Sequence, residues 1–269
     1  MECFLIGLFS IFFNMQQDTP KSLTQSSSRF LAGTLLSRVT GLIREISMAF
    51  VFGTNPVIAN FMTAFRFSSF FRRLLGEGAL HAAFVPEYEA RKKDSFEKGV
   101  SFFKTLSKSL TYLTLSLTLL VFILYYLVRT ERSDLLFFTV LLFPGLIFIT
   151  KAALNQSLLS CENKFFIPAV SPVAFNLIWI LGVLIFRKFP VEKSVILLSI
   201  SVVIAYMGQW LMTHPHTKKI TKEAANNSYE SIKPILKPLL LGIIGVSATQ
   251  INSVLDPIFA RVASLEGPA

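Results

Sequence analysis

The chain has 269 residues, of which 52% are hydrophobic and only 16% are charged. Soluble domains are closer to one quarter charged, so this composition argues against a soluble globular protein. The formal net charge is +10, but most basic residues fall between apolar runs, where they orient membrane helices; no nucleic acid partner is expected. The two cysteines, Cys3 and Cys161, are far apart and form neither a disulfide framework nor a metal motif.

Residues 1–28 are expected to form a disordered or interfacial extension. Their opening run is apolar, yet it lacks the positive region and the cleavage site of a signal peptide. Met15 is an alternative start of the chain.

Apolar runs predict an all-α, polytopic helical membrane protein, because about 20 apolar residues span a bilayer. Six spans occupy residues 29–213, a polar cytoplasmic loop follows at 214–233, and a seventh span with the start of the next loop occupies 234–269. The seven predicted spans are 29–52, 57–80, 104–128, 134–159, 168–187, 193–212 and 234–263. An odd number of helices ending in a loop suggests a chain truncated before a second lobe.

Loop charges predict the orientation of these spans. With the N-terminus in the cytoplasm, the inner segments carry thirteen lysines and arginines and the outer loops carry five. Cytoplasmic loops of membrane proteins are enriched in basic residues, so the N-terminus is expected inside.

Five arginines interrupt the first two predicted spans. They are Arg38, Arg44, Arg66, Arg72 and Arg73. An arginine far from a helix end in lipid costs from ~3 to more than ~10 kcal/mol, so it usually faces a protein interior or a water-filled cavity. Only two acidic residues, Glu45 and Glu77, lie in the same spans. The surplus predicts a membrane cavity that receives an anionic ligand.

Helical spacing gathers these arginines with serines. In the first span, Ser37, Gly41 and Arg44 fall on one stripe. In the second span, one stripe carries Arg66, Ser69, Arg73 and Glu77, with Arg72 about 100° away. Guanidinium groups stay charged in a dry site and offer a rigid fork of donors that suits phosphate.

Other readings of these residues stay open. Arg66 and Arg73 can also snorkel to an interface, and Glu77 can lock Arg73 by pairing with it. Asp256 can bind a coupling ion or cap the half-helix that follows Pro257. Single polar residues such as Asn176 usually hold helices together. No cluster in the sequence has the spacing of a metal site or of an enzyme's catalytic set.

Residues 36–90 resemble the N-terminal signature of the MurJ/MviN family of lipid II flippases, in the multidrug/oligosaccharidyl-lipid/polysaccharide exporter superfamily. The resemblance lies in the stretches LSRVTGLIRE at 36–45, AFVFG at 49–53, AFR at 64–66, FRRLLGEGA at 71–79 and AFVP at 83–86. It continues more weakly to about residue 265, which corresponds to the N-terminal half of such a protein.

This resemblance implies one lobe of a two-lobed exporter with a central cationic cavity, in the bacterial inner membrane. It implies transport of lipid II, the undecaprenyl-diphosphate-linked peptidoglycan precursor, to the outer leaflet, with other cell-wall synthesis proteins as partners. The family's substrate-binding positions fall on Ser37, Arg38, Arg44, Glu45 and Arg72, to which the stripe adds Ser69; Arg66, Arg73, Glu77 and Asp256 are cavity or gate candidates. No cofactor is expected; Na⁺ or the membrane potential is the implied driving force.

Three alternatives compete with the flippase. A drug or cation exporter of the same superfamily predicts acidic rather than arginine-rich cavity residues. A membrane enzyme acting on polyprenyl phosphates predicts clustered carboxylates or a catalytic histidine in a span. A structural scaffold of a cell-wall complex needs no unpaired arginines within the membrane.

Overall fold

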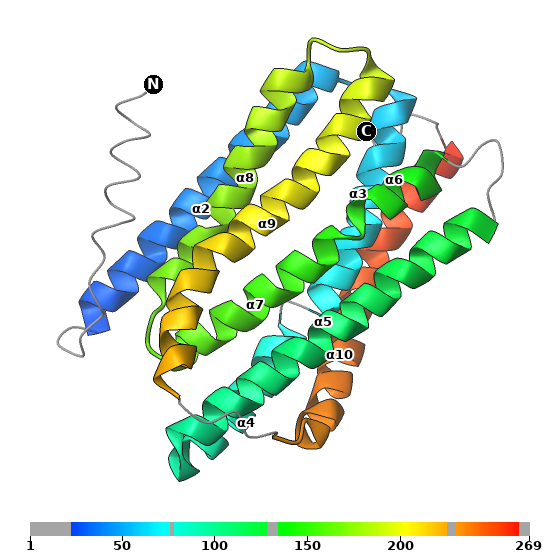
Figure 1. The fold of residues 1–269 in the computed structure, drawn as a ribbon. Coiled ribbons are helices and arrows are strands. Elements are labelled where there is room, and N and C mark those ends of the chain that lie inside the picture. Colours follow the sequence, from blue (N-terminus) through cyan, green and yellow to red (C-terminus); the bar gives the residue numbers. More distant parts are fainter. Residues whose placement is uncertain (1–22, 76–77, 128–133, 225–229, 264–269) are drawn as a thin grey trace.

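A computed structural model describes residues 23–75, 78–127, 134–224 and 230–263 (Figure 1). Every regular element in this part of the chain is a helix, which confirms the predicted all-α fold. The helices are α2 (Leu23–Phe52), α3 (Pro56–Leu75), α4 (Ala79–Asp94), α5 (Phe96–Leu127), α6 (Asp134–Leu142), α7 (Gly145–Cys161), α8 (Phe166–Phe186), α9 (Val191–Glu223) and α10 (Lys233–Ala263).

Three residues at the junction of α2 and α3 determine the turn that joins these helices. Gly53 has a φ of 55°, the left-handed conformation that commonly ends a helix, and its N–H donates to the carbonyl of Ala49. The Asn55 side chain then accepts a hydrogen bond from the N–H of Val57 at 2.9 Å. Pro56 opens α3, where its missing N–H is not needed.

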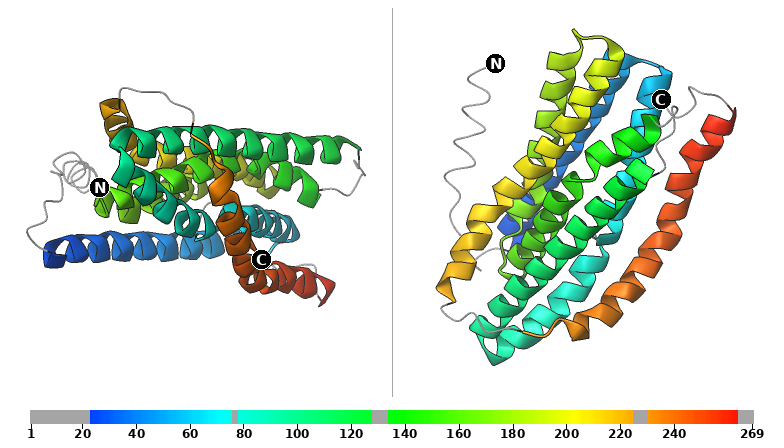
Figure 2. Two further views of the ribbon diagram at one scale, coloured as in Figure 1. Left: turned by 90° about the horizontal axis from the view of Figure 1, so that it is seen from below. Right: turned by 45° about the vertical axis from the view of Figure 1, so that its right-hand side comes forward.

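Most of the long helices run roughly side by side in one bundle, and α10 (orange to red) crosses them at an angle (Figure 2). α2 packs along α8, and α8 packs antiparallel to α9. α3 packs against α6, α7 and α9, whereas α10 packs against α4 and α3. α2 therefore reaches the rest of the bundle mainly through α8.

Two clusters of buried apolar side chains hold the bundle together. The first surrounds Phe61, Leu142 and Trp179 and joins α3, α6, α7, α8 and α9. The second surrounds Phe84 and Phe102, whose rings stack 5.8 Å apart, and joins α4, α5, α7 and α10. The candidate site described below lies against the first cluster.

Four stretches in the described part of the chain are long and apolar enough to cross a membrane. They are Phe96–Leu127, Asp134–Cys161, Phe166–Phe186 and Val191–Glu223. The arginine-bearing helices α2 and α3 do not meet the same measure. The chain is a polytopic helical membrane protein in which strongly apolar helices pack against the arginine-bearing α2 and α3.

The predicted C-terminal boundary of the second span is wrong. α3 stops at Leu75 rather than at residue 80, and a separate helix, α4, runs from Ala79 to Asp94. Pro86 lies within α4 and does not interrupt it. The interruption comes instead just before α4, where Gly78 has a φ of 68°.

The predicted loop at 214–233 is wrong over its first half, since α9 continues to Glu223 through Pro215. Packing outweighs the proline here: Thr213, Thr217 and Ile220 extend the buried face of α9. The hydroxyls of Thr213 and Thr217 bond to carbonyls of the same helix at 2.9 and 3.1 Å. α9 is therefore longer than its apolar run.

Two other predicted boundaries also shift. α2 begins at Leu23 rather than at residue 29, and the rest of the predicted extension, residues 1–22, lies outside the described residues. α5 begins at Phe96 rather than at residue 104. In the fourth span, Pro144 separates α6 from α7.

Gly145 is a close-contact point between α7 and α9. A methyl group added at Gly145 would lie 2.6 Å from the Tyr206 ring, so the ring or the helix must shift. We expect Gly145→Ala to lower the free energy of unfolding by ~1–3 kcal/mol, the usual effect of overpacking. Unfolding in detergent micelles measures this, with Gly245→Ala as the control because nothing lies within 4 Å of its added methyl. Equal stability of the two variants would contradict the packing described here.

Candidate functional site

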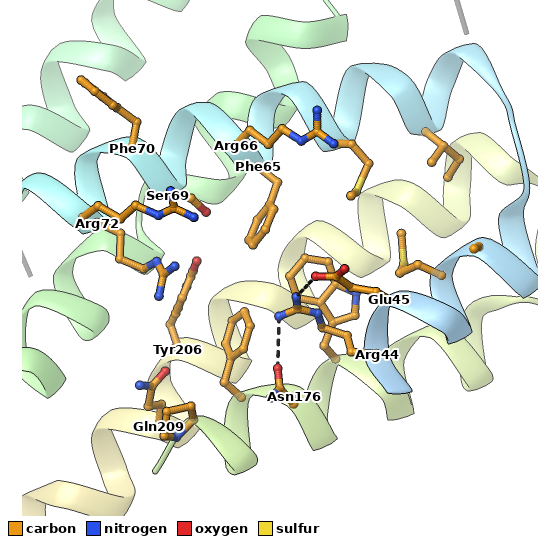
Figure 3. A pocket seen from close by; sticks show the side chains of 18 of the residues that line it. Arg44, Glu45, Phe65, Arg66, Ser69, Phe70, Arg72, Asn176, Tyr206 and Gln209 are labelled. Carbon is orange, nitrogen blue, oxygen red and sulfur yellow. Dashed lines mark hydrogen bonds and ion pairs between the residues drawn. The ribbon is translucent and has the colours of Figure 1, made fainter. Parts of the chain in front are cut away.

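A cavity of about 780 Å³ opens between α2, α3, α8 and α9 (Figure 3). Its polar and charged lining comes from all four helices. These residues are Arg44, Glu45, Arg66, Ser69, Arg72, Arg73, Asn176, Tyr206 and Gln209.

The side chain of Arg44 extends from α2 to α8 at the wall of this cavity. Its Nη1 donates to Oδ1 of Asn176 at 3.1 Å, and its Nη2 donates to Oε1 of Glu45 at 2.8 Å. The guanidinium carbon lies 4.9 Å from the Trp179 ring centroid, a cation–π distance. The Arg44 side chain is only 17% exposed whereas that of Glu45 is 71% exposed, so the arginine is fixed and its counter-ion is open to solvent or ligand.

Asn176 fixes the register of α2 on α8. Its Nδ2 donates to the backbone carbonyl of Ser37 and to the hydroxyl of Thr40, both at 3.1 Å, while its Oδ1 accepts from Arg44. A methyl group added at Gly41 would lie 3.6 Å from Nδ2 of Asn176, an ordinary van der Waals distance, so Gly41 also lies against α8. The Ser37–Gly41–Arg44 stripe therefore faces α8.

α3 supplies the opposite wall. Arg66, Ser69 and Arg73 line the cavity from one helical stripe, and Arg72 joins them from the neighbouring stripe. Arg66 is exposed, and Arg72 and Arg73 are partly buried. Figure 3 shows the labelled Arg66, Ser69 and Arg72 along one helix, across the cavity from Arg44 and Glu45.

Two buried donors of the lining have no hydrogen-bond partner among the described residues. They are the hydroxyl of Ser69, a residue 7% exposed, and the indole Nε1 of Trp179, a residue 1% exposed. Buried polar groups are normally paired, so unpaired ones in a cavity wall point to a ligand. Both can donate to an oxygen of a bound anion.

Aromatic rings cover the apolar side of the cavity. The rings of Phe65 and Trp179 meet edge to face at 4.7 Å, and those of Phe175 and Tyr206 stack at 4.6 Å. These residues join the cavity to the first buried cluster, because Trp179 and Tyr206 belong to both. The cavity wall is therefore backed by close-packed core.

The charge of the cavity is strongly unbalanced. Among the described residues, four arginines line it against a single glutamate, so it favours an anion. Within the described residues, no group of three histidine, cysteine or carboxylate side chains could hold a metal ion. The arrangement can bind a phosphate-like ligand by charge-assisted hydrogen bonds.

The structure brings together six of the residues singled out from the sequence and separates others. Arg38 is exposed on α2 and Ser37 contributes a backbone carbonyl to Asn176; neither lines the cavity. Glu77 and the side chain of Asp256 lie outside the described residues. The six that meet at the cavity are Arg44, Glu45, Arg66, Ser69, Arg72 and Arg73.

Sequence reasoning missed the contribution of α8 and α9. Asn176 was expected only to join helices, but it also holds Arg44. The sequence feature that could have indicated this role is that Asn176 is a lone amide in an otherwise apolar span. The aromatic residues Phe175, Trp179 and Tyr206 carried no such signal, because aromatic residues are frequent throughout these helices.

A family model described as "Lipid II flippase MurJ" matches residues 48–269. The chain belongs to the MurJ lipid II flippase family. Membership confirms the family resemblance that the first two spans suggested.

Individual relatives agree with this assignment. A probable lipid II flippase MurJ from Chlamydia pneumoniae is 35% identical over 259 residues, covering 94% of this chain and 47% of the relative. The relative of the same name from Chlamydia trachomatis is 32% identical over 260 residues, covering 94% of this chain and 48% of the relative. The chain thus spans about half the length of these MurJ proteins.

A solved structure described as "Lipid II flippase MurJ, inward closed conformation" has a similar fold. It superposes with a TM-score of 0.68 and 26% sequence identity, covering 88% of this chain and 53% of that one. The predicted class, a helical membrane protein with the fold of part of a two-lobed exporter, is confirmed. The relatives are named as flippases, so the prediction of a transporter family rather than an enzyme family is also confirmed.

Asn176 offers a direct test of the α2–α8 junction. We expect Asn176→Leu to lower the free energy of unfolding by ~1–3 kcal/mol, because it removes the donor to the Ser37 carbonyl and the Thr40 hydroxyl and one partner of Arg44. The control is Thr34→Val on α2, whose hydroxyl donates to the carbonyl of Phe30 within the same helix. Unfolding in detergent compares the two, and an Asn176→Leu variant as stable as the control would contradict the bridging role.

Proposed function

We propose that the protein to which this chain belongs moves lipid II from the inner to the outer leaflet, and that the arginine cavity binds the diphosphate of the substrate. The charge imbalance of the cavity carries this proposal: four arginines face a single glutamate. A diphosphate offers several oxygens with delocalised negative charge, which suits the planar donors of arginine.

The binding step follows from the geometry of the cavity. Arg66, Arg72 and Arg73 offer guanidinium donors along α3, and the Ser69 hydroxyl lies among them. On the other wall, Arg44 is held by Asn176 and its Glu45 partner is exposed. A diphosphate entering the cavity competes with Glu45 for Nη2 of Arg44 and draws the two walls together.

Transport then proceeds by alternating access. The cavity opens first to the cytoplasmic side, the arginines take the headgroup, and a rocking of helices exposes it to the outer side while the lipid tail stays in the bilayer. Rocking around a binding site near the membrane midplane is common among transporters. Ser37 and Arg38, which lie outside the cavity on α2, are proposed to meet the substrate in another stage of this cycle.

The proposal also includes the location, the orientation, the driving force and the partners of the protein. The protein is placed in the bacterial inner membrane with a cytoplasmic N-terminus, as the loop charges favour. Na⁺ or the membrane potential drives the cycle, and other cell-wall synthesis proteins deliver or receive the substrate.

A drug or cation exporter is the competing function. A cationic ligand would require carboxylates in the cavity; among the described residues of the lining, Glu45, already paired with Arg44, is the only carboxylate. The electrostatics therefore favour the anionic substrate.

Binding of purified lipid II to the 269-residue chain tests the proposal. We expect Arg72→Gln combined with Arg66→Gln to weaken binding roughly tenfold or more, because a hydrogen bond to a charged group contributes ~1.5–3 kcal/mol. The matched control is Arg187→Gln, which removes an exposed arginine outside the cavity. Native mass spectrometry in detergent reads the bound fraction.

Two outcomes would contradict the proposal. One is equal binding by the cavity variant and the Arg187→Gln control. The other is binding of an organic cation, such as a quaternary ammonium dye, in preference to lipid II. The second outcome would support the exporter alternative.

A further inference from the structure

A second group of basic residues lies away from the arginine cavity, on the parallel helices α7 and α9. Lys151 of α7 is half-buried, and its Nζ lies 5.7 Å from the ring centroid of Trp210 on α9. One turn further along α9, the His214 ring lies 4.8 Å from that of Trp210. None of these three residues lines the arginine cavity.

More lysines extend this group toward the end of the bundle. Lys151 and Lys218 are close enough for their charges to act on His214, and Lys164 and Lys219 act likewise on His216. Lys218 and Lys219 are exposed, and Lys164 is half-buried in the turn between α7 and α8. We call Lys151, Lys164, Trp210, His214, Lys218 and Lys219 the basic cluster.

Three carboxylates near this end of the bundle pair with residues outside the basic cluster. Glu162 accepts from Nζ of Lys92 at 2.7 Å and from the Tyr88 hydroxyl at 2.8 Å. Arg91 similarly pairs with Glu87 and Glu230. Within the described chain, no ion pair joins the four lysines of the basic cluster to a carboxylate, so their positive charge is available to an outside anion.

The position of the cluster along the helices indicates where that anion comes from. α9 begins at Val191, and the stretch from there to Trp210 is about 30 Å long, the thickness of the hydrocarbon core. Trp210 therefore falls at the level of the lipid headgroups, where tryptophan is enriched. A hydrogen bond of 3.0 Å from Asn155 to Thr213 fixes α7 to α9 at this level.

We propose that the basic cluster binds the phosphate headgroup of an anionic phospholipid. Lys151 and Lys218 contact the phosphate, Trp210 packs against the glycerol and the upper acyl chain, and Lys164 and Lys219 add long-range attraction. Basic pockets between membrane helices bind anionic headgroups in this manner. The basic cluster does not line the arginine cavity, so this proposal does not depend on the proposed transport of lipid II.

The chain carries a built-in probe of this site, because it has only two tryptophans. Trp179 is 1% exposed in the core, whereas Trp210 is partly exposed. In lipid nanodiscs that contain brominated phosphatidylglycerol or brominated phosphatidylcholine, quenching of Trp210 reports contact with each lipid. Subtracting the signal of a Trp210→Phe variant removes the contribution of Trp179.

We expect brominated phosphatidylglycerol to quench Trp210 more strongly than brominated phosphatidylcholine at equal mole fraction. Each of Lys151→Gln and Lys218→Gln should reduce this preference roughly fivefold, the effect of one basic residue near an anionic surface. Lys151→Arg should keep it. The matched control is Lys193→Gln, since Lys193 also lies beside an aromatic ring, that of Phe189 at 5.0 Å, but at the opposite end of α9.

Three results would overturn the proposal. They are equal quenching of the unaltered chain by both lipids, a preference that survives in the Lys151→Gln and Lys218→Gln double variant, and a preference lost to the same extent in Lys193→Gln. Loss of the preference on adding inorganic phosphate, but not on adding sodium chloride of the same ionic strength, would assign the site to free phosphate instead.

Discussion

The bridge between Arg44 and Asn176 is the interaction on which the site depends. A charge removed from water must be paired or hydrogen-bonded, and Arg44 satisfies this with an amide, a carboxylate and the face of Trp179. The same amide holds the backbone of α2 through the Ser37 carbonyl. One contact set therefore docks α2 onto α8 and positions a guanidinium at the cavity wall.

The cavity also explains why the charged helices need support from apolar ones. α2 and α3 carry the arginines and are not apolar enough to count as spans by composition, whereas α5, α6–α7, α8 and α9 are. The arginines of the cavity can stay within the membrane region because rings such as Phe65, Phe175 and Trp179 back them on one side and the cavity lies on the other. Stability and anion binding are thus divided between different helices of one bundle.

The sequence predicted the helical fold and much of the site because both rest on local patterns. Apolar runs revealed the spans, and helical spacing placed Arg66, Ser69 and Arg73 on one wall. Patterns along one helix could not reveal what faces that helix, so the aromatic wall and the second role of Asn176 were missed. The continuation of α9 past Pro215 was missed because buried contacts, and not local propensity, maintain it.

A photoreactive lipid II analogue, with its reactive group beside the diphosphate, would show whether the arginine cavity binds the diphosphate. Digestion and mass spectrometry of the irradiated 269-residue chain would locate the adducts. If the cavity binds the diphosphate, we expect adducts within residues 65–73 of α3 and 172–179 of α8, which line the cavity. Adducts confined to the outer surface of α5 would contradict it.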